Sequence, residues 1–167
     1  MPRTRRYRRT GNRDKYSIEQ TNIVSPVLSE WPLVEPTSEA ESNSRQYAIS
    51  ILPPVTFEGM RKVKHLTISF SFIQDIPLFY AVVFVPQGYT PQPIHIPSAG
   101  NAVTQYNANQ FVMSSGILDF SGGPCRIKSR LSRNLNSGDS IALILAAINS
   151  TSDAFVFAQV SYAITLQ

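Results

Sequence analysis

The residues best suited to chemistry lie in the first fifteen positions of the chain. Five arginines fall within seven positions there, interleaved with Tyr7, and the basic residues of the whole segment are Arg3, Arg5, Arg6, Arg8, Arg9, Arg13 and Lys15. A guanidinium group is a planar fork of donors that matches a phosphate, and a tyrosine ring can stack on a base. With Asp14 as its one acid, this segment has a net charge of +6. Because like charges this dense repel one another, we expect residues 1–15 to form an arm that is disordered until a polyanion binds it.

A second group of basic residues alternates with other residue types along residues 125–132. On a β-strand these side chains would share one face, about 7 Å apart; they are Arg126, Lys128 and Arg130. Three like charges in a row are unfavourable without a counter-charge, which a nucleic-acid backbone would supply. The alternatives are a solvated face, or ion pairs with the glutamates of a neighbouring subunit. We expect Arg133 to extend this series, and residues 61–64 to be a weaker example of the same kind.

Catalytic and metal-binding groups are sparse. His65, His95 and Cys125 offer no tetrahedral zinc site of the usual spacing, and no nucleophile elbow supports a serine-histidine-aspartate triad. Asp119 and Asp139 are more typical of turns than of a catalytic carboxylate pair. We therefore expect a protein that is not an enzyme, that holds no metal or cofactor, and whose histidines are structural.

The chain that must position the basic residues has a β pattern from residue 44 onward. The expected strands are residues 45–52, 64–72, 78–85, 110–115, 125–132, 140–148 and 155–166. Most alternate between apolar and polar residues, whereas 78–85 and 140–148 are apolar on both faces, as strands between two layers are. Seven or eight antiparallel strands with Gly, Pro and Asn breaks predict a β-sandwich or barrel, and the long connection over 86–109 favours Greek-key crossing between sheets.

Charge and composition divide the chain into three parts. After the arm, residues 16–43 form an extended, proline-containing acidic segment, whose apolar residues we expect to lie on the domain or on a neighbouring subunit; residues 44–167 form the β domain. The net charge is −5 over residues 16–58 and +3 over 59–167, so the total of +4 conceals the polycation. Only 16% of residues are charged, against about 25% in typical soluble domains. We expect other protein to cover part of the surface.

Neither a secretory signal nor a membrane span is predicted. No apolar stretch follows the basic start, as it would in a signal peptide, and the longest apolar runs are far shorter than the roughly 20 residues that cross a bilayer. We expect synthesis in the cytosol and no membrane insertion.

Three segments carry a resemblance to a known family: YAVVFVPQG at 80–88, YNANQFVMSSG at 106–116 and SRLSRNLNSGDSI at 129–141. Together with the basic arm, they resemble capsid proteins of small circular, Rep-encoding single-stranded DNA viruses, the group that includes circoviruses. The resemblance extends from the arm to about residue 148. It implies an eight-stranded viral jelly roll, a T=1 icosahedral shell of sixty identical subunits, and an arm that faces inward onto a packaged single-stranded DNA genome.

The same resemblance implies a location in the virion and in the host nucleus. In that family the arm binds DNA and acts as a nuclear import signal, so a host import receptor is an expected partner. It assigns no role to Arg126, Lys128 and Arg130, and the acidic stretch at residues 30–41 departs from the family pattern.

Other functions remain open on the sequence. The coat protein of a small satellite RNA virus would use the same fold and a similar arm, because an arginine-rich arm does not distinguish DNA from RNA. A jelly-roll binding module, such as a trimeric cytokine-like ligand or a lectin, would need secretion and gives the arm no role. A cupin-type enzyme would need a metal site that two separated histidines cannot build.

Overall fold

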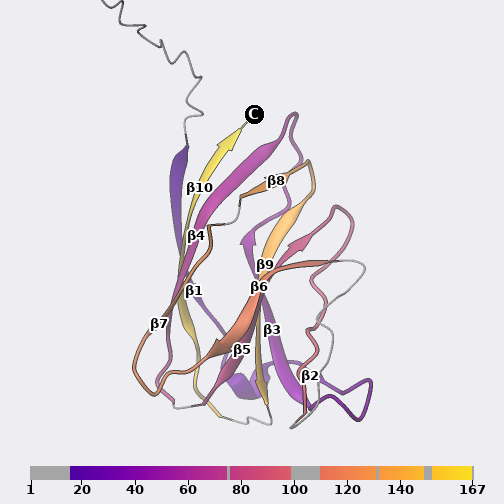
Figure 1. Ribbon diagram of the computed structural model, residues 1–167, viewed down its shortest axis with the longest axis vertical. Coiled ribbons are helices and arrows are strands. Elements are labelled where there is room, and N and C mark those ends of the chain that lie inside the picture. The colour runs from indigo at the N-terminus through magenta and orange to yellow at the C-terminus, as the bar shows by residue number, and fades with distance from the viewer. Residues whose placement is uncertain (1–15, 75, 99–109, 131, 149–151, 167) are drawn as a thin grey trace, which may run out of the picture.

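Two antiparallel sheets pack face to face in the computed structural model, which describes residues 16–74, 76–98, 110–130, 132–148 and 152–166 (Figure 1). Sheet A has the order β1-β10-β4-β7, with the short β8 also beside β4, and sheet B has the order β2-β3-β9-β5-β6. The strands are β1 Ser17–Val24, β2 Leu33–Val34, β3 Ser44–Leu52, β4 Arg61–Ser71, β5 Leu78–Val85, β6 Phe111–Leu118, β7 Cys125–Lys128, β8 Arg133–Leu135, β9 Ser140–Ile148 and β10 Phe157–Leu166. A three-residue 3-10 helix, η1 (Leu28–Glu30), precedes β2. No helix in the described ranges is long and apolar enough to cross a membrane.

The strand pairing is nested, and this decides the topology. β1 pairs with β10, β3 with β9, β4 with β7 and β5 with β6, all antiparallel, as in one long hairpin with its tip between β5 and β6. The pairings β10–β4 and β9–β5 roll this hairpin into two sheets. A long hairpin rolled into a two-sheet sandwich is a jelly roll. The predicted all-β jelly roll is therefore confirmed.

The core lies between the sheets, and a second apolar cluster covers the other side of sheet B. In β9, Ile141 and Leu143 face the main core, whereas Ala142 and Ile144 face outward. That outward side is not open to solvent, because Ile94 and Ile96 of the preceding long connection pack on it. Because β9 is covered on both sides, residues 140–148 are apolar on both faces, as the sequence predicted for a strand between two layers.

Part of the acidic segment belongs to the sandwich itself. Residues 17–24 form β1, an edge strand of sheet A, and both Leu28 and Trp31 are fully buried in the main core. The Trp31 indole stacks on Tyr47 and donates its Nε1–H to the carbonyl of Pro26 at 3.0 Å. The sequence did not predict β1, because nearly all its residues are exposed and they therefore show no alternation of apolar and polar types.

A bulge explains why β4 begins at residue 61 and not at the expected residue 64. His65 has a φ of 55°, and the register between β10 and β4 shifts at this point. Val63 and Leu66 both face the core, so the period of two breaks between them. The expected strand at 125–132 ends earlier, at Lys128 of β7, and a separate strand, β8, follows at Arg133–Leu135. The two strands pair with opposite ends of β4.

Candidate nucleic-acid interface

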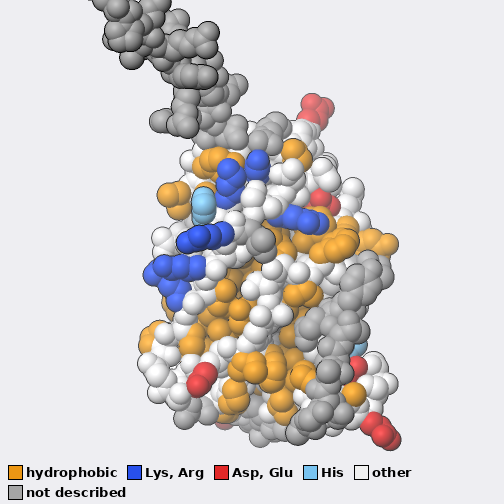
Figure 2. Space-filling model, viewed as in Figure 1, with side chains coloured by type: hydrophobic (Ala, Val, Ile, Leu, Met, Phe, Trp, Pro, Cys, Tyr) orange, Lys and Arg blue, Asp and Glu red, His pale blue; other side chains and the backbone are white. Residues whose placement is uncertain are grey.

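The pairing of β4 with β7 brings two separate basic stretches of the sequence together. Lys128 pairs with Thr67 and Arg126 with Ser69 on the outward face of sheet A. Lys62 and Lys64 also point outward from β4, since Arg61 and Val63 turn inward. We call the exposed and half-exposed set the basic cluster; it consists of Lys62, Lys64, Arg126, Lys128 and Arg130. Figure 2 shows Lys and Arg side chains gathered over the side of the sandwich where β4 and β7 lie.

The alternation within β7 is the one expected from the sequence. Arg126 and Lys128 are exposed, whereas Cys125 and Ile127 are half-buried and pack against the main core. The Nε–H of Arg126 donates to Ser69 Oγ at 3.2 Å, which ties its side chain to the face of β4. Arg130 lies just beyond the end of β7 and is exposed. The binding role of these residues stays a prediction.

The basic cluster has no carboxylate partner in the described part of the chain. Within those ranges, the carboxylate that lies within 4 Å of a basic side chain is that of Glu41, which contacts His95 at the opposite sheet. The acidic residues with exposed side chains lie at other places; they are Glu19, Glu30, Glu35, Glu39, Glu58, Asp119 and Asp153. Like charges on neighbouring positions of a sheet destabilise it, so this cluster is suited to an external anion.

The arm joins the sandwich beside this cluster. Tyr16 is the first described residue, and the ammonium of Lys64 lies 4.3 Å from the centre of its ring. The predicted DNA-binding residues of the arm, Arg3, Arg5, Arg6, Arg8, Arg9, Arg13 and Lys15, lie outside the described residues, and their role stays a prediction. Because Tyr16 directly follows the arm, a polyanion that binds the arm would come close to a second set of cations, the basic cluster.

Arg61 does not belong to the interface. Its side chain is 8% exposed, and Nη2 donates to the carbonyls of Asp139 at 3.0 Å and Pro53 at 3.3 Å. The guanidinium also lies 5.1 Å from the centre of the Phe57 ring. Burial lowers the pKa of Arg61, although guanidinium groups stay protonated at any ordinary pH. This arginine holds the loops at one end of the sandwich together.

The expectation that Arg133 extends the basic series is wrong. Its guanidinium lies 4.1 Å from the centre of the Phe84 ring and 5.5 Å from that of Phe111, both on sheet B. Arg133 pairs with Val63, an inward-facing residue, because β8 starts a new alternation after the chain leaves β7. The side chain therefore bridges the two sheets through cation–π contacts and is turned away from the cluster.

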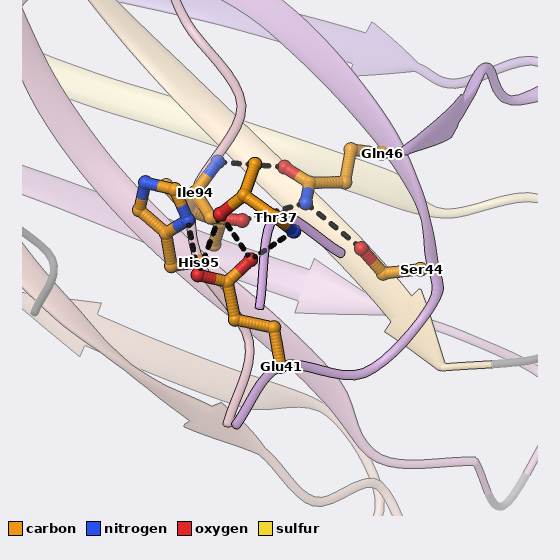
Figure 3. Close-up of polar contacts among 6 residues, drawn as sticks. All are labelled: Thr37, Glu41, Ser44, Gln46, Ile94 and His95. Carbon is orange, nitrogen blue, oxygen red and sulfur yellow. Dashed lines mark hydrogen bonds and ion pairs between the residues drawn. The ribbon is translucent and has the colours of Figure 1, made fainter. Parts of the chain in front are cut away.

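A second polar group lines a pocket of about 230 Å³ on the outer side of sheet B (Figure 3). Glu41 accepts hydrogen bonds from Thr37 N at 2.9 Å and Thr37 Oγ1 at 3.0 Å, and its Oε1 lies 3.1 Å from His95 Nδ1. The bond from the Thr37 backbone is the main reason that the pKa of Glu41 is below its ordinary value. These contacts tie the turn at residues 37–41 to the connection that contains His95.

Two buried glutamines fasten the same connection to sheet B. The Gln46 amide donates to Ile94 O at 2.7 Å and accepts from Ile94 N at 2.8 Å. Gln110 forms the same pair of bonds with Gln92, at 3.0 and 2.9 Å. Sequence reasoning missed both glutamines, because a polar residue at a strand position normally indicates a solvent-facing side chain and nothing local marks these two as buried.

Comparison with known proteins adds little to this geometry. No family model matches the chain, and no curated protein matches it closely enough to count as a relative. Among solved structures, one similar chain comes from a structure of the Gx strain of infectious bursal disease virus, with 10% sequence identity and a TM-score of 0.18 over 89% of this chain. This chain spans 39% of that one. A likeness of this size carries no functional argument, so the fold rests on the strand topology itself.

Proposed function

We propose that this chain is a viral capsid protein. Identical copies assemble into a T=1 icosahedral shell and package a single-stranded DNA genome by neutralising its phosphates. The observation that supports this most is the basic cluster: it has no acidic partner in the described ranges and lies where the arginine-rich arm joins the jelly roll. No catalytic step is part of this proposal, and the arm also serves as a nuclear import signal.

The two sets of cations suit a phosphate backbone and require no particular base sequence. Each phosphate that a Lys or Arg neutralises releases condensed counterions, which makes binding weaken steeply with salt. The arm contributes seven basic residues, and the cluster contributes five, four of which lie on two strands of a rigid sheet. The arm would capture the polymer, and the sheet would fix where its backbone runs relative to the shell.

Self-assembly fits the distribution of apolar side chains on the surface. Several large ones are exposed on strands or at their ends, among them Leu33, Ile117 and Leu166, and the overall fraction of charged residues is low. A shell subunit has such surfaces because its neighbours cover them. The exposed basic residues of the described ranges are then concentrated where the subunit meets nucleic acid.

A matched pair of substitutions tests the interface. Ser161→Glu places a carboxylate on the outward face of sheet A, since Ser161 pairs with Thr67, which in turn pairs with Lys128. Ser50→Glu places the same charge on the exposed side of β3 in sheet B. We expect Ser161→Glu to weaken binding of oligothymidylate, measured by fluorescence anisotropy at low salt, and Ser50→Glu to leave it unchanged. An equal effect of both variants would contradict the placement of the interface.

A further inference from the structure

We infer that the outward face of sheet A is a platform on which the bases of a single-stranded nucleic acid lie, while the basic cluster holds its phosphates. This inference rests on the proposed function and adds a second recognition element, contacts to the bases on a defined sheet face, beside the neutralisation of phosphates. The register of the four strands places the outward residues in rows that end at the cluster. From β1 through β10 and β4 to β7, two of these rows are Asn22, Gln159, Ser69 and Arg126, and Gln20, Ser161, Thr67 and Lys128.

The rows are rich in side chains that both donate and accept hydrogen bonds. Asn22 and Gln20 are exposed, Gln159 is half-exposed, and Gln159 Nε2 donates to Asn22 Oδ1 at 3.3 Å. Base edges also carry donors and acceptors side by side, so amides and hydroxyls can pair with any of the four bases. The rows contain no carboxylate, which would repel the backbone.

An aromatic ring lies next to these rows. Phe157 is 36% exposed on the outward face of β10, between Val24 of β1, which is 57% exposed, and Ser71 of β4. Bases of single-stranded nucleic acid stack on exposed rings without regard to sequence. Phe157 occupies the row adjacent to Gln159, so one strand of nucleic acid can contact both.

The spacing of the sheet suits a nucleotide laid across it. Neighbouring strands are about 4.8 Å apart, so β10 lies roughly 10 Å from β7. If the nucleic acid runs along the β7 edge of the sheet with a phosphate at Lys128, the base of that nucleotide can therefore lie over β4 and β10. In a duplex the base edges are already paired and the base faces are stacked, so a duplex would contact the cluster alone. The platform should accordingly favour single strands.

A second copy of this chain is the competing occupant, because its acidic residues Glu30, Glu35 and Glu39 could pair with the cluster. Those carboxylates could pair with the lysines and arginines, but they would not account for the exposed aromatic ring or for the rows of amides. The cations of the cluster complement phosphates, and the uncharged amide rows with their neighbouring ring complement bases, so we commit to nucleic acid. The experiment below distinguishes nucleic acid from the acidic segment of a second copy as the occupant of this face.

The test compares two probes that differ only in their bases. The full-length protein is titrated with labelled oligothymidylate and with an abasic deoxyribose-phosphate oligomer of the same length. The ratio of the two affinities reports the contribution of the bases. Because Tyr7 of the arm can also stack, the decisive quantity is the change in this ratio caused by substitutions on the platform.

We expect Phe157→Ala to lower the ratio about fivefold or more, the effect of losing one stacked base, and Gln159→Ala to lower it less. Neither change should alter the affinity for the abasic oligomer. Phe157→Tyr should retain the ratio, which shows that a loss in Phe157→Ala is not a folding defect. Tyr89→Ala removes a comparably exposed ring beside sheet B and should have no effect.

Each alternative outcome has a distinct meaning. A ratio that Phe157→Ala and Gln159→Ala leave unchanged overturns the platform while the proposed function stands. Binding of neither probe overturns the proposed function, and the platform with it. Self-association of the protein that is lost when Glu30, Glu35 and Glu39 are replaced by glutamine, together with a ratio that Phe157→Ala leaves unchanged, identifies the acidic segment of a second copy as the occupant and also overturns the platform.

Discussion

Three arginine side chains in the described ranges have different environments, and one of these environments suits nucleic acid. Arg126 is exposed on a sheet face, Arg61 is buried and bound to two carbonyls, and Arg133 lies over two aromatic rings. All three belong to short basic stretches that look alike in the sequence. The face of the strand on which each one falls, and not the residue type, determines what it can bind.

Lys128→Gln provides a direct test at the residue scale. Each phosphate contact on a single strand contributes about 0.7 to the slope of log affinity against log salt. We expect this variant to reduce the slope by about that amount while the fold is unchanged, because Lys128 is exposed and unpaired with any described carboxylate. Arg61→Met is the control: it removes one charge from the buried site and should leave the slope as it is. A slope that falls equally in both variants would show that net charge alone matters.

Among the elements, the connection between β5 and β6 depends on side chains far away in the sequence. Gln46 of β3 binds the backbone of Ile94 in both directions, and the bond length of 2.7 Å from its Nε2 indicates a well-formed contact. The packing of Ile94 and Ile96 then covers sheet B. This connection is an outer layer of the domain and not a loose loop over residues 91–97.

Gln46→Ala should therefore destabilise the protein by about 1–3 kcal/mol, because it leaves a buried N–H and a buried carbonyl of Ile94 without partners. The free energy of unfolding in urea gives the magnitude, and hydrogen exchange should show lost protection at the Ile94 amide. Ser50→Ala on the exposed side of the same strand is the matched control. Unchanged exchange at Ile94 in Gln46→Ala would contradict this description of the connection.

Acid should weaken the neighbouring contact between Glu41 and residue 37. Hydrogen bonds from Thr37 lower the pKa of Glu41 below 4.5 in the folded chain, so the unfolded chain binds this proton more readily. The stabilisation is present above pH 4.5 and is lost as the pH falls through the lowered pKa. We expect Glu41→Gln to unfold more easily than the wild type at neutral pH and the difference to vanish in acid, as measured by urea unfolding across pH. A difference that persists unchanged in acid would exclude this linkage.

The strands predicted best from the sequence are those in which both faces are covered by other parts of the domain. Residues 78–85 and 140–148 match β5 and β9 because layers on both sides require apolar residues throughout. β1 was missed because an exposed edge strand imposes no pattern. Only part of the basic cluster could be predicted. Lys62 and Lys64 share a surface with Arg126 and Lys128 because β4 pairs with β7. The paired residues are about sixty positions apart in the sequence, so no local pattern contains this contact.

At the scale of the whole molecule, positive and negative charges are separated in a way that suits a subunit with two unlike surroundings. The basic cluster lies on sheet A next to Tyr16, the first described residue after the arm, whereas Glu35, Glu39 and Glu41 lie on the segment beside sheet B. A single polyanion can then be held on one side while the rest of the surface contacts other copies of the chain. The total charge of +4 gives no indication of this separation.

Deletion of residues 1–15 should leave assembly possible and empty the particles of most nucleic acid. The deletion removes +6 of charge from each subunit but no described contact of the sandwich. The ratio of absorbance at 260 and 280 nm of purified particles measures the packaged nucleic acid, and it should fall to the value of protein alone. Digestion of the wild-type contents with DNase or RNase distinguishes a DNA genome from an RNA genome. An absorbance ratio that the deletion leaves unchanged would contradict packaging through the arm.

Electron microscopy of the purified full-length protein tests the central claim most directly. If the chain is a shell-forming capsid protein, the images will show uniform, small icosahedral particles with nucleic acid inside. Discrete small oligomers of the jelly roll, with no closed particles under any salt condition, would contradict it and favour a binding module.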